Sequence, residues 1–258
     1  MSVFYEEIKD FIKIYTAFHI EYSNIGSEII LISGKNIAFN LIENGKYILS
    51  PQTIPTITEQ YYSRGIQLIH IWEDIWITRK VQVKSIIKAK LGFASTIFAR
   101  KTEIVKLTKP ELDDFLNQNH LMGTTSCKHK YGLKYNGELV AATAWGPIRK
   151  YYYGDKVNNS AELIRYANLN DILVTGGLSK LISHYIKEYH PDDIMTYIDK
   201  DWSNGEVYRM LGFSEKETTP PKAFILDNQF KRNVLNDTSQ PKDIIYNSGN
   251  IKFIKYLD

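Results

Sequence analysis

Apolar and polar positions follow two different periods in the first part of the chain. Residues 2–18 carry one apolar stripe with charged residues off it, which is the spacing of an amphipathic helix. The stripe consists of Phe4, Ile8, Phe11, Ile12 and Tyr15. Residues 27–49 instead read as three apolar runs, EIILI, IAFNLI and YIL, separated by the turn sequences SGKN and ENGK. Because Asn-Gly between apolar runs favours a tight hairpin, we expect a helix followed by strands joined by hairpin turns.

The next segments change between helix and strand patterns. Residues 55–64 have helix spacing, IQLIHIW at 66–72 reads as a buried strand, and Trp76 to Leu91 reads as another helix. One face of that last helix is basic and consists of Arg79, Lys80, Lys84, Lys88 and Lys90. Such a face either contacts DNA phosphates or is simply exposed to solvent, and the sequence leaves both interpretations open.

A second group of elements begins near Ile104. A helix starts at Thr108, with Pro110 in its first turn and Glu111 three residues after Thr108, which is the pattern of a capping box. YGLKYNGELVAATAWG reads as a hairpin that turns at Asn136-Gly137. The polar segment RKYYYGDKVNNSA, residues 149–161, is expected to be a mobile loop.

The stretch from Glu162 to Phe213 carries the candidate chemistry. It reads as strand, glycine turn, amphipathic helix, strand and a short helix closed by Gly212. A glycine turn that opens a helix directs backbone N–H groups and the positive helix end at one point, so it predicts a pyrophosphate site. The candidate residues are Thr175, Gly176, Gly177, Ser179 as helix cap, and Lys180. The alternative is that the two glycines only make a turn.

Composition narrows the class of protein. A chain of 258 residues with 43% hydrophobic content can form two domains, since domains usually hold about 100 to 200 residues. The formal net charge of +3 fits contact with nucleic acid without requiring it. The 18 tyrosines either stack on bases or fill half-buried strands. Cys127 is the only cysteine, which excludes an intrachain disulfide and a cysteine-cluster metal site.

The sequence also bears on location. MSVFYEEIKDF lacks the basic start and apolar core of a signal peptide, and no apolar run reaches the roughly 18 residues that a membrane helix needs. A lone cysteine fits a reducing compartment. We therefore expect a cytoplasmic protein, in the host cytoplasm if a phage encodes it, with no membrane partner.

The stretch RGIQLIHIWEDIWITRKVQVKSIIKAKLG, followed by TIFARK, resembles the end of a nuclease-like module in phage proteins related to very-short-patch repair endonucleases. The resemblance implies a restriction-endonuclease-like mixed sheet with flanking helices. Active relatives have an Asp in a pattern like ELDIYI, a later Glu and a Trp-His pair. In this chain an isoleucine stands at the Asp position, Ala38 stands at the Glu position, and the Trp-His pair is missing.

Four carboxylates of this region are left for a rearranged Mg²⁺ site: Glu28, Glu43, Glu73 and Asp74. The favoured interpretation is a degenerate nuclease fold that is kept for DNA binding or packing. No metal is expected.

The order of elements in the second part resembles the GNAT acyltransferase superfamily: a helix, a hairpin, a strand with ELIRYA, the glycine turn, a strand with IMTYID, and a short helix ending YRMLGF. Within it, the closer resemblance is to the phage Mom family of DNA adenine modifiers and to the GNAT-like half of phage nuclease fusions. The matching pieces are Asn119-His120-x-x-Gly123, Leu163 to Ala167, Asp199 with Trp202, and Gly205 to Phe213. The resemblance implies acyl-CoA, such as acetyl-CoA, as cofactor, with its pyrophosphate on the glycine turn.

Acyl transfer from a thioester needs a neutral amine, an oxyanion donor and an acid for the leaving thiolate. The resemblance places Tyr208 as the acid, although a core tyrosine explains this residue equally well. His120 is either a base or substrate contact, or a capping or buried histidine.

Asp199 follows a buried strand at the carboxyl edge of the sheet, where open sheets bind ligands, and is a candidate catalytic residue. Arg165 lies in an apolar strand and needs a partner; with Asp199 it forms either a structural ion pair or the polar floor of the site. Asn119, Trp202 and Ser203 are candidate substrate contacts. Ser203 caps the last helix in the alternative interpretation.

The end of the chain, from Phe230, mixes cations with aromatic residues. This mixture suits phosphate contact and base stacking, or equally an edge strand guarded by lysines. The cations are Lys231, Arg232, Lys242, Lys252 and Lys255.

We therefore predict an α+β protein with a degenerate restriction-endonuclease-like mixed-sheet domain at residues 1–103 and a GNAT-like mixed-sheet acyltransferase domain with a basic tail at residues 104–258. The predicted function is acylation of a base amine in phage or host DNA, without nuclease activity. Two alternatives stay open. One is a non-catalytic or homing-endonuclease-derived DNA-binding protein, and the other is an acyltransferase that acts on a small amine or a protein.

Overall fold

The computed structural model of the protein describes residues 2–47, 49–153, 156–235 and 244–257. It is a mixed α+β structure that divides into two compact units. Unit 1 comprises Met1–Leu91, Ile198–Gly205 and Thr218–Ile251, and unit 2 comprises Gly92–Tyr197, Glu206–Glu217 and Lys252–Asp258. The division reflects compactness alone, so the predicted domain families, with their boundary after residue 103, stay a prediction.

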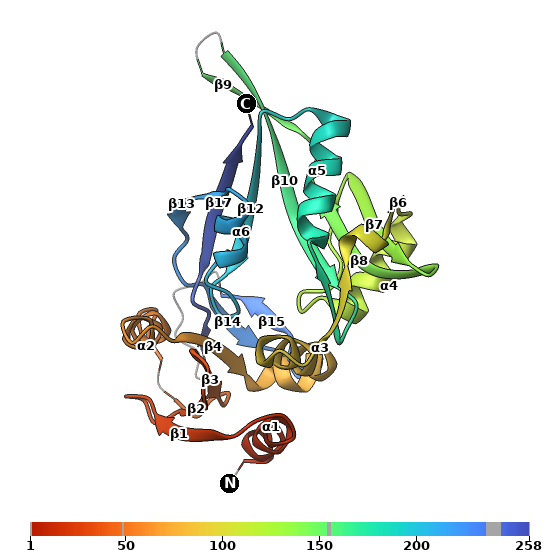
Figure 1. Cartoon of the computed structure of the whole chain (residues 1–258). Coiled ribbons are helices and arrows are strands. Elements are labelled where there is room, and N and C mark those ends of the chain that lie inside the picture. The colour runs from red at the N-terminus through yellow and green to blue at the C-terminus, as the bar shows by residue number, and fades with distance from the viewer. Residues whose placement is uncertain (1, 48, 154–155, 236–243, 258) are drawn as a thin grey trace. The chain divides into compact units, whose positions relative to one another are not determined.

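Unit 1 begins with a helix and a four-stranded mixed sheet (Figure 1). The elements are α1 (Val3–Lys13), β1 (Phe18–Tyr22), β2 (Glu28–Ile32), β3 (Ile37–Ile42), α2 (Thr53–Tyr62), β4 (Gln67–Trp72) and α3 (Glu73–Leu91). The strands lie in the order β1-β2-β3-β4, and the first three are antiparallel neighbours. Strands β3 and β4 are parallel, because α2 carries the chain back between them.

Strands β2, β3 and β4 of this sheet are buried on both faces, whereas the edge strand β1 is partly exposed. Ile29 and Leu31 of β2 pack with Ile57 and Tyr61 of α2 on one face. The alternate residues of β2, Ile30 and Ile32, point to the other face and are also buried. A sheet that is covered on both sides explains why its strands read as continuous apolar runs in the sequence.

Most elements expected in this region are confirmed, but the hairpin at Asn44-Gly45 is wrong. Among the described residues no strand follows that turn. Instead, Tyr47 and Leu49 pack against a cluster that contains Ile42 and Trp72. The Asn44 amide donates to Glu73 Oε2 (3.0 Å), so the turn is held by a side chain rather than by a strand ladder.

A chain of buried hydrogen bonds crosses the core of unit 1. Ser27 Oγ donates to Asn40 Oδ1 (2.7 Å), and Asn40 Nδ2 lies 3.0 Å from His70 Nδ1. Because Nδ1 accepts, His70 Nε2 carries the proton and donates to Thr58 Oγ1 (2.8 Å), which donates to the Ile54 carbonyl (2.9 Å). Burial lowers the pKa of His70 to about 4, so the imidazole is neutral near physiological pH.

The later segments of unit 1 are joined to β4 and α3 by buried charges. Strands β14 (Ala223–Leu226), β15 (Arg232–Val234) and β16 (Ile245–Tyr246) form a small antiparallel sheet. Arg232 donates from Nε to Asp74 Oδ2 (2.7 Å) and from a second nitrogen to Asp74 Oδ1 (3.0 Å), while its guanidinium lies over the Trp72 ring. Asp201 accepts hydrogen bonds from Trp72 Nε1 (3.2 Å) and from the Ser248 amide (2.9 Å).

Unit 2 contains most of an eight-stranded sheet in the order β13-β17-β12-β10-β8-β7-β6, with β9 paired to β10. The strands are β6 (Glu103–Lys106), β7 (His129–Tyr135), β8 (Glu138–Trp145), β9 (Arg149–Tyr153), β10 (Lys156–Asn168), β12 (Asp193–Asp199), β13 (Ser214–Thr218) and β17 (Asn250–Tyr256). The other elements are β5 (Ser95–Phe98), the 3-10 turn η1 (Ala99–Lys101), α4 (Lys109–Asn119), β11 (Ile172–Thr175), α5 (Gly177–Tyr189) and α6 (Glu206–Met210). Strands β5 and β11 pair in parallel outside the large sheet.

Helices α4 and α5 cover opposite faces of the sheet. Leu112 and Phe115 of α4 pack in one cluster with Ala142 and Ala144 of β8. Trp145, the next residue of β8, points the other way and stacks on Tyr185 of α5, with ring centroids 3.9 Å apart. Strand β8 has small alanines on the face that α4 covers and the large Trp145 on the face that α5 covers. This explains the sequence ATAW at the end of the strand.

Three expectations for this region can be compared with the structure. The capping box of Thr108 and Glu111 is confirmed, and so is the hairpin at Asn136-Gly137, where both residues have positive φ. The expected mobile loop at residues 149–161 is wrong. Residues 149–153 form β9 and residues 156–161 begin β10, because Tyr151, Tyr152 and Val157 favour an antiparallel ladder.

No described helix is long and apolar enough to cross a membrane.

Removing the positive partner of the buried pair should destabilise the protein strongly. Arg232→Met leaves Asp74, whose side chain is 1% exposed, buried without its cation, so the free energy of unfolding should fall by about 3–5 kcal/mol. Urea unfolding at neutral pH measures the loss. The control is Lys13→Met at the exposed Lys13–Asp10 pair, which should change stability by less than about 1 kcal/mol. Equal losses in the two variants would contradict the assignment, and Asp74→Asn added to Arg232→Met should recover part of the loss.

The buried imidazole predicts a pH dependence. Because the pKa of His70 is lowered to about 4 from an unfolded value of about 6.5, its contribution is fully present above pH 6.5 and is lost as the pH falls toward 4. The expected loss across this window is on the order of 3 kcal/mol. Unfolding free energies measured from pH 7.5 to 4 should show this slope, and His70→Gln should remove it. An unchanged slope in His70→Gln would show that other groups cause it.

Candidate functional site

Two neighbouring parallel strands of unit 2 pair over a short distance only. The register of β10 with β12 runs from Ser160↔Asp193 to Leu163↔Thr196, whereas β10 continues to Asn168. At the same place the register of β10 with β8 shifts between Leu163 and Arg165, which leaves a bulge at Ile164. Thr196 Oγ1 donates to the Leu163 carbonyl (2.8 Å). We call this point, defined by Leu163, Ile164 and Thr196, the fork.

Helix α6 brings Tyr208 to the fork. The Tyr208 ring packs edge-on against Phe213 (centroids 5.5 Å apart) and almost parallel to Phe253 (6.0 Å). Burial raises the pKa of Tyr208 to about 12, and a hydrogen bond with Thr196 opposes this rise. The hydroxyl therefore keeps its proton at neutral pH, which makes it a donor rather than a base.

A second tyrosine hydroxyl lies between the fork and the start of α5. Tyr166 Oη donates to Asn168 Oδ1 (2.8 Å) and accepts a hydrogen bond from the Leu178 backbone. Burial raises the pKa of Tyr166 above its usual range, and the nearby Tyr208 adds to the rise. A Cβ on Gly177 would lie 2.8 Å from this hydroxyl, so glycine is needed there for close packing. Sequence reasoning missed Tyr166.

The glycine turn forms as predicted and begins α5. Gly176 is the N-cap residue of α5, with φ of 78°, and no side chain caps the helix N-terminus with a hydrogen bond. Ser179 therefore lies inside the first turn, and the expectation that it caps the helix is wrong. Thr175 and Gly176 are exposed, whereas Gly177 is buried.

Lys180 is held by backbone groups on a distant part of the sequence. Its Nζ donates to the Ala99 carbonyl (2.9 Å) and also to the Thr102 carbonyl. The parallel pairing of β11 with β5, in which Thr175 lies opposite Phe98, brings this segment alongside the glycine turn. Two exposed cations of η1, Arg100 and Lys101, are thereby carried close to the start of α5. No local sequence signal could have placed them there, because the pairing joins strands far apart in the chain.

Asn119 and His120, at the end of α4, are already bound to backbone. Asn119 Oδ1 accepts from the Asn170 amide (2.8 Å), and its Nδ2 donates to the Phe115 carbonyl (2.8 Å). His120 is the C-cap of α4, and its Nδ1 accepts from the Met122 amide (3.1 Å). These contacts support the capping interpretation of His120, while substrate contact by either residue stays a prediction.

The remaining predicted residues lie in different units. Arg165 of unit 2 donates to the Ile164 carbonyl (3.0 Å), at the bulge of the fork. In unit 1, Asp199 Oδ1 accepts from the Asp201 amide (2.9 Å), and the Trp202 and Ser203 amides donate to the Asp199 carbonyl. Ser203 Oγ accepts from the Gly205 amide (3.1 Å). The pairing of Arg165 with Asp199 stays a prediction.

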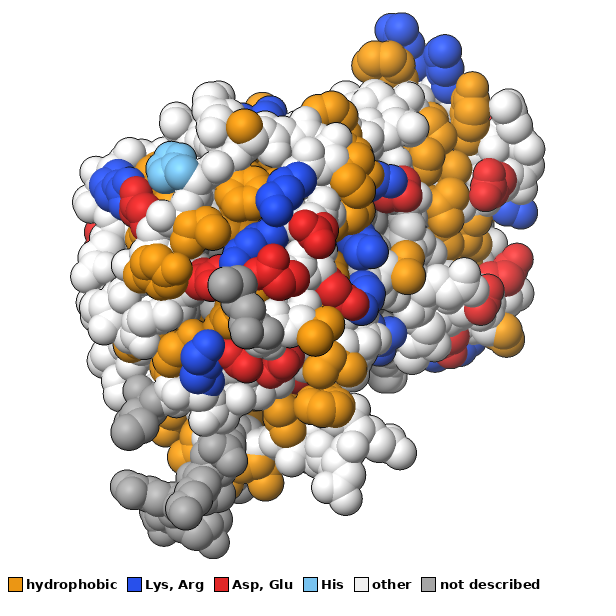
Figure 2. Space-filling view, turned by 90° about the horizontal axis from the view of Figure 1, so that it is seen from below, with side chains coloured by type: hydrophobic (Ala, Val, Ile, Leu, Met, Phe, Trp, Pro, Cys, Tyr) orange, Lys and Arg blue, Asp and Glu red, His pale blue; other side chains and the backbone are white. Residues whose placement is uncertain are grey.

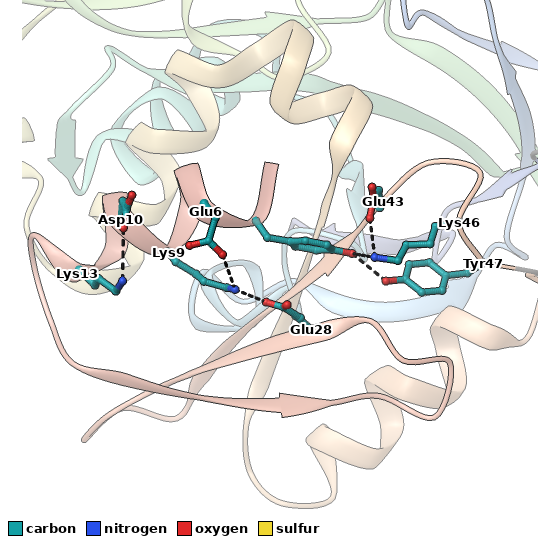
Figure 3. A network of polar contacts seen from close by, with 9 residues as sticks. Glu6, Lys9, Asp10, Lys13, Glu28, Glu43, Lys46 and Tyr47 are labelled. Carbon is teal, nitrogen blue, oxygen red and sulfur yellow. Dashed lines mark hydrogen bonds and ion pairs between the residues drawn. The ribbon is translucent and has the colours of Figure 1, made fainter. Parts of the chain in front are cut away.

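The four carboxylates left for a rearranged nuclease site each have their own partner in unit 1. Figure 3 shows Glu28 with Lys9 (2.7 Å) and Glu43 with Lys46 (2.7 Å). Glu73 accepts from the Asn44 amide, and Asp74 binds Arg232. In the part of the chain that the structure describes, no group of three or more His, Cys, Asp or Glu side chains is arranged to hold a metal ion.

The cations of the C-terminal segment are largely engaged as well. Arg232 binds Asp74, Lys255 donates to the Leu211 carbonyl (2.6 Å), and Lys252 lies 4.0 Å from Glu217. Lys231 is exposed, and Lys242 lies outside the described residues. Figure 2 shows basic and acidic side chains interspersed on the face that it draws. Three of the five cations are thus already held by other groups, and phosphate contact by the tail stays a prediction.

The close contact at Gly177 gives a prediction for the glycine turn. Gly177→Ala would place a Cβ against the Tyr166 hydroxyl and Val174, and should destabilise the protein by about 1–3 kcal/mol. Adding Tyr166→Phe removes the clashing oxygen and should recover part of that loss, as a double-mutant cycle in urea would show. Ser179→Ala, in the same helical turn, is the matched control with a small effect. Additive losses in the double variant would contradict the contact.

Searches against protein-family models and against curated proteins gave no match. About 61% of the chain aligns with solved acetyltransferase structures at low sequence identity. A histone acetyltransferase and related acetyltransferase from Corynebacterium glutamicum is 13% identical, with TM-score 0.40 and 97% of that chain covered. A Bacillus subtilis acetyltransferase in complex with CoA is 14% identical (TM-score 0.41, 100% of that chain covered). A GNAT family acetyltransferase from Elizabethkingia anophelis with acetyl-CoA bound is 15% identical (TM-score 0.35, 99% covered). At these values the matches assign the chain to no family.

Proposed function

We propose that unit 2 is a GNAT-like N-acyltransferase that uses acyl-CoA. The observation that carries the proposal is the fork, where β10 and β12 stop pairing and Tyr208 supplies a protonated hydroxyl. Ligands of open α/β sheets bind at the carboxyl ends of strands, and parted strands leave backbone groups for an extended ligand. The sequence resemblance to GNAT acyltransferases supports the same interpretation.

The residues at the start of α5 fit the phosphates of such a cofactor. The helix has no side-chain cap, the residues just before it, Thr175 and Gly176, are exposed, and the segment with Arg100 and Lys101 is paired alongside them. A helix N-terminus flanked by cations attracts anionic phosphates. Lys180 also has a structural role, because its hydrogen bonds to Ala99 and Thr102 fix η1 beside the turn, and we keep it among the groups proposed near the phosphates. When bound, acyl-CoA would supply the activated acyl thioester.

The protein's own groups would handle protons at the fork. The Tyr208 hydroxyl, with its pKa of about 12, holds a proton at Oη at neutral pH and can give it to a leaving group. Tyr166, bound to Asn168 and Leu178, fixes the backbone between the fork and α5. The acceptor amine must reach the site neutral, and we include Arg165, at the bulge of the fork in the same unit, as a polar group that receives it.

We further propose that the acceptor is an amine of a DNA base. Reaching an amine inside a duplex requires the base to be flipped out, at a free-energy cost of a few kcal/mol. The proposal is supported by the resemblance to DNA adenine modifiers and by the basic hairpin described below.

Mass spectrometry of nucleosides tests the reaction. DNA incubated with the protein and acetyl-CoA should yield a nucleoside heavier by one acetyl group, and Tyr208→Phe should lower the rate by roughly 10²-fold or more. Parallel reactions with a polyamine and a lysine-rich peptide separate the acceptor classes. An adduct only on these acceptors would overturn the DNA assignment. No adduct on any acceptor, together with no binding of coenzyme A, would favour a non-catalytic DNA-binding protein.

One substitution separates cofactor binding from folding. Ser179→Asp puts a negative charge in the first turn of α5, where it should leave stability unchanged or slightly higher, because helix N-termini favour anions. The same charge should repel the cofactor phosphates, so the rise in Tm caused by coenzyme A should disappear. Ser179→Asn is the matched uncharged control. A coenzyme A shift that persists in Ser179→Asp would place the phosphates elsewhere.

A further inference from the structure

The hairpin formed by β9 and the start of β10 presents cations and aromatic rings to solvent. Pairs run from Arg149↔Ser160 to Tyr153↔Lys156, and β9 pairs with β10 alone in the described sheet. In Figure 1 the hairpin extends beyond the neighbouring strands of unit 2 as a two-stranded ribbon. Its exposed residues include Arg149, Lys150, Tyr151 and Tyr152, and the Tyr152 side chain is 70% exposed. A tyrosine this exposed contributes little to the core, and its ring is accessible to a partner.

Among the residues whose side chains the structure describes, each face of the ribbon carries one cation and one tyrosine ring of β9. Side chains alternate along a strand, so Arg149 and Tyr151 share one face, while Lys150 and Tyr152 share the other. Val157, opposite Tyr152, lies on that second face and is 41% exposed. The two members of each set lie about 7 Å apart along the strand.

The cations of the ribbon are available for a partner. Among the described residues neither Arg149 nor Lys150 forms an ion pair, whereas two other exposed cations of unit 2 do. Lys109 binds Asp113, and Arg209 binds Glu215 at 2.6 Å. Unpaired positive charge next to exposed rings is complementary to a strand that carries phosphates and accessible bases.

We propose that the β9–β10 hairpin binds single-stranded or locally opened nucleic acid, with Arg149 and Lys150 on phosphates and Tyr151 and Tyr152 stacked on bases. This inference rests on the proposed function, because it names the class of nucleic acid on which the proposed acyltransferase acts. Rings can stack only on bases that are not already stacked in a duplex, so the partner is an unpaired segment. A duplex opened at one base, as acylation of a base amine requires, provides such a segment.

The test measures binding of fluorescently labelled single-stranded DNA to the full chain without acyl-CoA. Lys150→Glu should weaken binding at least tenfold, and Lys150→Gln should lower the slope of log affinity against log salt by about 0.7. Tyr152→Ala should weaken binding on the order of tenfold at any salt concentration, because it removes stacking rather than charge. Tyr152→Phe, which keeps the ring, should bind like the unchanged protein.

The matched control is Lys106→Glu on β6, which makes the same charge change at an exposed position on the far edge of the sheet. Equal weakening by Lys150→Glu and Lys106→Glu would overturn the proposal, because only net charge would then matter. Stronger binding to duplex DNA, to anionic vesicles or to an acidic peptide than to single-stranded DNA would also overturn it.

The outcome is distinguishable from failure of the proposed function. Loss of DNA binding in the hairpin variants, with the Tm shift by coenzyme A retained, supports the hairpin assignment and leaves the acyltransferase intact. DNA binding by the hairpin in a protein that coenzyme A does not stabilise would instead refute the acyltransferase and keep this inference.

Discussion

The buried contacts around Trp72 and Asp74 are the constraint on which the rest of unit 1 depends. Asp74 is almost completely enclosed, and a carboxylate in such a place persists only with a cation and further hydrogen-bond donors. Arg232 supplies the cation from β15, and Asp201 ties the segment after β12 to Trp72 and to Ser248. The backbone amide of His70 donates to the Asp201 carbonyl (2.9 Å), so the same segment also meets the polar chain in the core. The start of α3 with β4, the segment after β12, and the C-terminal segment that contains Arg232 and Ser248 are thus held together by a few polar contacts.

In unit 2 the corresponding constraint is geometric. A four-residue parallel register, a bulge at Ile164 and the Thr196 hydroxyl together stop the pairing of β10 and β12 at one point. The two tyrosines at this point come from β10 and α6 and keep their protons at neutral pH. The geometry of the fork and of the start of α5 therefore depends on packing between several elements rather than on any single residue.

Local sequence patterns predicted those elements that local forces determine. The amphipathic stripes of α1 and α5, the capping box at Thr108 and the Asn136-Gly137 turn all depend on neighbouring residues, and all formed. The hairpin predicted at Asn44-Gly45 was wrong, because Tyr47 and Leu49 pack against the apolar cluster around Trp72 instead of forming a second strand. The prediction of a loop at residues 149–161 was wrong, because the β propensity of the tyrosines outweighed the turn-forming residues around them.

The site was predictable only in part. The glycine turn and Tyr208 have local signatures, so the sequence could place them. The proximity of Arg100 and Lys101 to the turn and the engagement of Lys180 depend on the pairing of β5 with β11, which has no local signal. Likewise, the buried state of Arg232 depends on a partner 158 positions earlier in the chain, and sequence alone presented it as a surface cation.

The discontinuous make-up of unit 1 has a consequence for how the protein is made. Because Arg232, Ile245 and Ser248 complete a core begun by β1 to β4, that core cannot close during synthesis until residue 248 has left the ribosome. Until then Trp72 and the apolar edge around it wait uncovered, which is the condition under which nascent chains associate wrongly or recruit chaperones. Chains cut short before residue 232 would lack Ile245, which packs with Trp72, and the cation that pairs with Asp74.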